Sequence, residues 1–166
     1  MSTQFTITLA GQDRPQIMHQ LAQVTHRHDG KWLVSQIHRL DGQIVGIIRI
    51  DAPEPQHADL KHALTQFTEC HIRVIDAVDA QPLKMEKATL NVEAKDRTGL
   101  VHDLTAELDR LGIDVLRIEN HRLGVPEAGQ VLFFAKLEVS LPESADKWQI
   151  TRLLEEVEPS MNVELS

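Results

Sequence analysis

The strongest constraint on the fold is a repeat inside the sequence. The dipeptide Asp13-Arg14 recurs 83 residues later as Asp96-Arg97. At the same offset, His38-Arg39-Leu40 recurs as His121-Arg122-Leu123. The matches extend over most of each half, and two copies are too few for a solenoid, so we expect a duplicated domain.

Both copies show the same order of hydrophobic patterns. Alternation of apolar and polar residues, as in Ala88–Ala94, is typical of a half-buried strand, and the leucines of Leu100–Leu111 follow helical spacing. Each copy is expected to contain, in order, a strand, a helix, two strands, a helix and a strand. In the first copy these elements are residues 5–9, 17–28, 31–40, 42–51, 60–67 and 72–78. In the second copy they are residues 88–94, 100–111, 113–120, 131–139, 150–157 and 161–165. This order predicts two ferredoxin-like βαββαβ domains of the α+β class with antiparallel sheets, at residues 1–80 and 87–166, joined by a linker at 81–86 that contains Pro82.

Length and charge exclude several classes of function. A chain of 166 residues can hold one or two domains, and its single cysteine, Cys70, rules out an internal disulfide and suits a reducing cytoplasm. No apolar run approaches the roughly 20 residues of a membrane span, and no signal sequence opens the chain. The net charge of -8, without a Lys/Arg cluster, argues against direct binding to nucleic acid.

The histidines do not form a metal-binding pattern. Nine are present, but His26 and His28 are two residues apart and His57 and His62 five apart, which is poor spacing for chelation on one helix face. We therefore expect no metal and no other cofactor.

The repeated Asp-Arg dipeptide lies between the first strand and the first helix of each copy. We expect Pro15 at the first helical position, with Asp13 or Arg14 at the cap. The exposed N–H groups of a helix N-terminus favour a carboxylate, and a nearby Asp could hold an ammonium group, so the loop could bind a zwitterion. Gly99 would let the backbone approach a ligand closely. The alternative is structural: the Asp caps the helix and pairs with the adjacent Arg.

The loop pattern G-x-D-R-P-G-[IL] after a strand, within βαββαβ, resembles the ACT domain. Two such domains alone in a chain of this length resemble the glycine cleavage system transcriptional repressor family of proteobacteria; the similar stretches are Lys31–Gln43 with Gly46–Arg49, and Ala94–Leu104. By position, the resemblance implies a ligand-binding loop at Gly11, Asp13, Arg14 and Pro15 in the first copy, and at Asp96, Arg97, Gly99 and Leu100 in the second. Gln16 replaces the usual glycine and Thr98 the usual proline, so we favour the second loop as the ligand site.

The resemblance implies a non-catalytic regulatory protein. It would sense an amino acid, with glycine favoured, and pass that state allosterically to a protein partner, a DNA-binding regulator of glycine cleavage genes. Self-association into a homo-oligomer, a dimer, is also implied. The alternatives are a nucleic-acid-binding protein of the same fold, which the low aromatic content of 4% disfavours, and an acylphosphatase-like enzyme, for which no nucleophile and base converge in the sequence.

Overall fold

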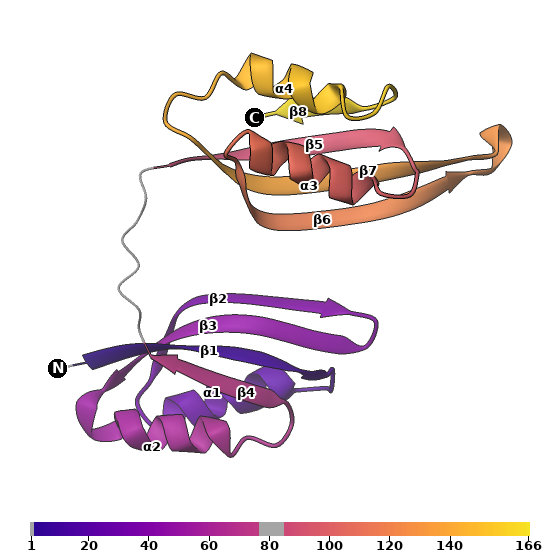
Figure 1. Cartoon of the computed structure of the whole chain (residues 1–166). Coiled ribbons are helices and arrows are strands. Elements are labelled where there is room, and N and C mark those ends of the chain that lie inside the picture. The colour runs from indigo at the N-terminus through magenta and orange to yellow at the C-terminus, as the bar shows by residue number, and fades with distance from the viewer. Residues whose placement is uncertain (1, 77–84) are drawn as a thin grey trace. The chain divides into compact units, whose positions relative to one another are not determined.

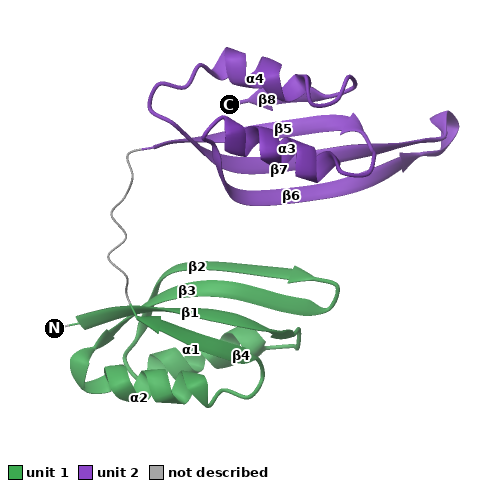
Figure 2. Cartoon of the chain, in the orientation of Figure 1, with its two compact units in different colours: residues 1–80 green, residues 81–166 purple. Residues whose placement is uncertain are grey.

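A computed structural model describes residues 2–76 and 85–166 of the chain. The chain divides into two compact units, unit 1 at Met1–Ala80 and unit 2 at Gln81–Ser166 (Figure 2). Most of the predicted linker, Pro82 included, lies outside the described residues, and Glu86 at its end already belongs to a strand.

Unit 1 has the predicted element order. Its elements are β1 (Ser2–Gln12), α1 (Ile17–Arg27), β2 (Lys31–Leu40), β3 (Gln43–Pro53), α2 (Glu54–Thr65) and β4 (His71–Asp76). The strands form one antiparallel sheet in the order β2-β3-β1-β4. Both helices cover the same face of this sheet (Figure 1), and the other face carries no helix of the unit.

Unit 2 repeats this topology. Its elements are β5 (Glu86–Lys95), α3 (Leu100–Arg110), β6 (Asp114–Val125), the short 3-10 helix η1 (Pro126–Ala128), β7 (Gln130–Leu141), α4 (Lys147–Glu155) and β8 (Asn162–Leu165). The antiparallel order β6-β7-β5-β8 is the counterpart of the order in unit 1, and η1 occupies the longer connection of the second hairpin. The prediction of two ferredoxin-like βαββαβ units of the α+β class is confirmed.

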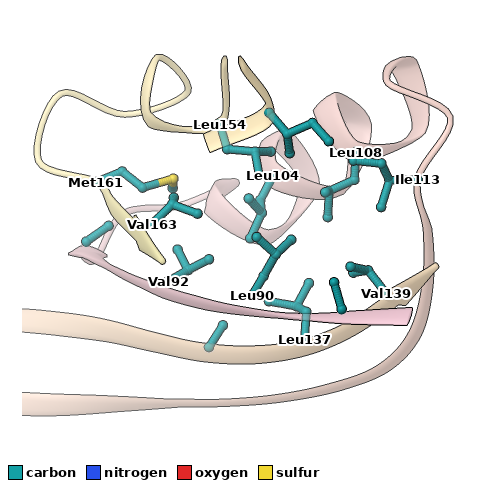
Figure 3. Close-up of a cluster of buried hydrophobic side chains, with 14 of the residues drawn as sticks. Leu90, Val92, Leu104, Leu108, Ile113, Leu137, Val139, Leu154, Met161 and Val163 are labelled. Carbon is teal, nitrogen blue, oxygen red and sulfur yellow. The ribbon is translucent and has the colours of Figure 1, made fainter. Parts of the chain in front are cut away.

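Each unit has its own hydrophobic core between sheet and helices. In unit 2, Leu90 and Leu137 of the sheet and Leu104, Leu108 and Leu154 of the helices are fully buried (Figure 3). Burial of such a side chain contributes about 1.5–3 kcal/mol, so the alternation along the strands determines which face the helices cover. The strand residues that alternate with the core residues, such as Asn91, Glu93, Phe134 and Lys136, lie on the helix-free face of the sheet.

The turn between β2 and β3 follows directly from its sequence. Asp41 and Gly42 have φ values of 51° and 72°, the pair of positive angles that a type I′ hairpin turn requires. Gly42 tolerates this conformation because it has no Cβ. The turn places the start of β3 between the end of β2 and the end of β1, where the first Asp-Arg loop begins.

No helix within residues 2–76 and 85–166 combines the length and the apolar character needed to cross a membrane.

Candidate functional site

The two Asp-Arg loops, residues 13–16 and 96–99, connect β1 to α1 and β5 to α3. The expected cap is wrong: α1 begins at Ile17 with Gln16 as its N-cap, and α3 begins at Leu100 with Gly99 as its N-cap. Both cap residues have a left-handed backbone, with φ of 66° at Gln16 and 79° at Gly99. This extra turn, which contains Pro15, separates the Asp-Arg dipeptide from the helix, so neither Asp13 nor Arg14 is in a capping position.

The first turns of α1 and α3 have no side-chain cap, although the N–H of Ile17 donates to the carbonyl of Arg14. No side chain of a described residue caps either helix, and the same holds for α2, whereas in α4 the Asp146 carboxylate accepts hydrogen bonds from the backbone N–H groups of Trp148 and Gln149. The first N–H groups of a helix have no partner within the helix and attract negative charge. The loops of α1 and α3 therefore present free donors that a ligand carboxylate could accept.

The aspartate of each loop is bound by the arginine of the second repeated motif. The Nε atom of Arg39 lies 3.0 Å from the nearer Asp13 carboxylate oxygen, and that of Arg122 lies 2.9 Å from Asp96 Oδ1. The N–H of Asp13 also donates to the carbonyl of Gly42, and that of Asp96 to the carbonyl of Val131. The two motifs that recur 83 residues apart thus contact each other in both units and hold the loop against the hairpin.

The arginine of each dipeptide does not pair with its adjacent aspartate, contrary to the structural alternative. Arg14 lies 3.1 Å from Glu69 on the surface. Arg97 is more enclosed: it contacts Glu158 at 2.8 Å and Asp103 at 2.9 Å, and it donates to the carbonyl oxygens of Thr98 and Val157.

These contacts shift the ionisation of the groups around Arg97. The hydrogen bond from Arg97 lowers the pKa of Glu158, and the same ion pairs raise the pKa of Arg97 itself. Hydrogen bonds from His102 and then Arg97 lower the pKa of Asp103. The guanidinium of Arg97 therefore fixes the loop 96–99 onto the connection between α4 and β8.

Two predicted site residues have a role in packing. A Cβ added to Gly11 would lie 3.0 Å from the Cβ and 3.2 Å from the Cα of Cys70, so this glycine permits close contact between β1 and the residue before β4. Cys70 is buried, and burial followed by the charge of Glu69 raises the pKa of its thiol. Leu100 is 1% exposed within the core of unit 2, so only its backbone can face the loop.

Three surface cavities lie on the helix-free sheet faces, and none of the three is lined by a residue of either loop. The largest, about 430 Å³, extends across all four strands of unit 2 and includes His121 and Phe134. Sequence reasoning missed it, although the alternation along β5 to β8 already placed its lining residues on one face. Among the residues that the structure describes, no group of three or more His, Cys, Asp or Glu side chains is arranged to hold a metal ion.

The fold and the paired loops define a protein built from two copies of one small α+β module. Residues 3–72 match the family model of the ACT domain. The match lies within unit 1, and unit 2 has the same sheet order as unit 1.

Solved structures share this fold over the whole chain. A structure named "an Unknown Protein from Galdieria sulphuraria" superposes with a TM-score of 0.84 at 23% identity, over 100% of this chain and 98% of that one. A structure named "putative glycine cleavage system transcriptional repressor" gives a TM-score of 0.68 at 12% identity, over the same shares of the two chains. No curated protein sequence matches the chain.

Proposed function

We propose that the chain is a non-catalytic regulatory protein that senses an amino acid through the loops at the starts of α1 and α3. The observation that carries this proposal is that both helices lack a side-chain cap and so keep free N–H donors. The ACT-domain match supports regulation by amino acids, because ACT domains are regulatory modules and many of them bind amino acids at this loop.

The free N–H groups would donate to the α-carboxylate of the ligand, and the loop aspartate would accept from its ammonium group. A carboxylate can accept about four hydrogen bonds, so the single bond from Arg122 leaves capacity on Asp96. In unit 1, Arg39 lies close to both oxygens of Asp13, which leaves less capacity. This difference favours loop 96–99 as the ligand site.

The cap residues favour the same loop. At Gly99 the space where a Cβ would project is open, with Arg97 Nη1 as the nearest atom at 3.9 Å. In unit 1, Gln16 fills the equivalent position with a side chain. A small ligand such as glycine suits the second loop, because no side chain at position 99 blocks its approach to the backbone N–H groups at the start of α3.

We further propose that ligand binding controls a protein partner, a DNA-binding regulator of glycine cleavage genes, from within a homo-oligomer. The structural similarity to a protein named as a repressor of that system supports this interpretation. The net charge of -8 supports action through a partner over direct contact with DNA.

Calorimetry with glycine and the other amino acids at millimolar concentration tests the ligand. We expect saturable heat with one or a few of them, and we expect Asp96→Asn to weaken that binding at least tenfold while the matched variant Asp13→Asn changes it little. Circular dichroism would verify that both variants stay folded. Absence of heat and of any thermal shift with every amino acid would overturn the sensing proposal.

A further inference from the structure

We propose that the helix-free face of unit 2 carries a second ligand site, which binds a small organic cation with a flat apolar body. The cavity of about 430 Å³ that includes His121 and Phe134 lies on this face. Its volume falls in the range of roughly 300–1,000 Å³ that is usual for small-molecule sites. It is lined from all four strands, so a rigid sheet forms its floor.

Strand register arranges the lining residues in two rows. In the first row, His121 of β6 lies opposite Phe134 of β7, which lies opposite Glu93 of β5, which lies opposite Asn162 of β8. The second row, in the same strand order, is Glu119, Lys136, Asn91 and Glu164. The β6–β7 side of the first row is thus aromatic, and the β5–β8 side of the cavity carries carboxylates.

The carboxylates of Glu93 and Glu164 are the part of the cavity that attracts a cation. They occupy diagonal positions on neighbouring strands, a relation that places side chains within about 7–8 Å of each other. Neither makes an ion pair with any residue in the described parts of the chain, whereas Glu119 pairs with Arg117. The two like charges repel at this spacing. Lys136, the diagonal neighbour of Glu93 on β7, also lines the cavity, but no ion pair joins it to either carboxylate within the described residues, so an ammonium group between Glu93 and Glu164 would relieve the repulsion.

The aromatic side of the cavity accounts for the flat apolar body. The rings of His121 and Phe134 stack with centroids 5.3 Å apart and planes 16° from parallel. This pair forms a planar wall beside Glu93, its register neighbour. A cation near such rings gains from the negative potential of their faces, and a planar body gains from stacking.

The equivalent face of unit 1 lacks these features, so the site is specific to unit 2. Its corresponding row is His38, Val45, Ala10 and His71, and the position equivalent to Glu164 is Arg73. The cavity on that face is about 200 Å³ and has no carboxylate in its lining. The duplicated fold therefore provides an internal comparison in which an organic cation is not expected to bind.

The probe pair 2-phenylethylamine and 3-phenylpropionate tests the charge preference, because the two molecules share a phenyl group and differ in the sign of their charge. In NMR titrations of the full chain we expect saturable shifts at Asn91, Glu93 and Phe134 with the amine, and none with the acid. Equal binding of the acid, or no saturable binding of the amine, would overturn the proposal.

Variants test the assigned residues. The double variant E93Q/E164Q is expected to weaken amine binding at least tenfold, while Glu138→Gln, on the same face but outside the cavity, leaves it unchanged. Unchanged affinity in the double variant would overturn the proposal. A different oligomeric state of the double variant from that of the wild type on ultracentrifugation would also overturn it, since that would identify a second copy of the chain as the occupant of the cavity. Asp96→Asn, which tests the amino-acid site, should leave amine binding intact, so the two proposals can fail separately.

Discussion

Positions 16 and 99 place different residues in the same left-handed backbone conformation. Gly99 adopts its φ of 79° without steric cost, whereas the Cβ of Gln16 is strained at 66°. The left-handed region costs a residue with a side chain roughly 1–2 kcal/mol. The first loop thus carries strain that the second one lacks.

Exchange of these residues measures that strain. We expect Gln16→Gly to raise the free energy of unfolding of unit 1 by about 1 kcal/mol, since the relief of strain is partly offset by the greater freedom of glycine when unfolded. Gly99→Ala should lower the free energy of unfolding of unit 2 by a similar amount. Urea titration monitored by circular dichroism checks both variants, and a destabilised Gln16→Gly protein would show that the Gln16 side chain makes a compensating contact.

The loops also show which structural features could be predicted from the sequence and which could not. The order of elements was predictable because each strand and helix shows its buried face in its periodicity. The cap at Gln16 was not predicted, because glutamine does not by itself indicate a positive φ, although its alignment with Gly99 at the repeat offset was a usable signal. The Asp13–Arg39 contact depends on the hairpin, although the shared offset of both motifs was a usable signal for it.

At the scale of elements, Arg97 joins the loop before α3 to the segment between α4 and β8 through Glu158. The cavity on the helix-free face of unit 2 belongs to this scale as well. Alternation placed Glu93, Phe134 and Lys136 on one face, but the hollow between them depends on how the strands twist, which alternation does not report.

The Arg97–Glu158 contact predicts a dependence of stability on pH. Because the folded state lowers the pKa of Glu158 below its ordinary value of 4.5, the contact stabilises unit 2 above about pH 4.5. This contribution is lost as the pH falls through the lowered pKa of the folded state. We expect Glu158→Gln to have a lower melting temperature than the wild type at pH 7 and a shrinking difference in acid.

Thermal melts at a series of pH values check this prediction. Glu143→Gln is a matched control, because Glu143 is exposed and makes no ion pair with a described residue. A difference between wild type and Glu158→Gln that stays constant down to pH 2 would show that the ion pair does not carry the effect.

At the scale of the whole molecule, the two units have separate hydrophobic cores and one tryptophan each. Trp32 of unit 1 donates a hydrogen bond to Thr25 Oγ1 at 3.0 Å, and Trp148 of unit 2 is 68% exposed. These are the only two tryptophans of the chain, so the fluorescence of each reports on its own unit.

Separate cores predict separate unfolding. Leu90→Ala removes a fully buried side chain from unit 2 and should lower the free energy of unfolding of that unit by about 2–5 kcal/mol. In a Trp148→Phe background, the denaturation curve of Trp32 should stay unchanged. A parallel shift of the Trp32 transition would mean that the units unfold as one cooperative body.

The divergence of the two helix-free faces has a consequence for evolution and engineering. The strand residues that face the helices are apolar in both copies, whereas Ala10 and Arg73 have Glu93 and Glu164 as their counterparts. Doubling of the gene kept one kind of interior in both halves and allowed their exteriors to drift apart. A designer can therefore recode one exterior of this scaffold without redesigning the interior beneath it.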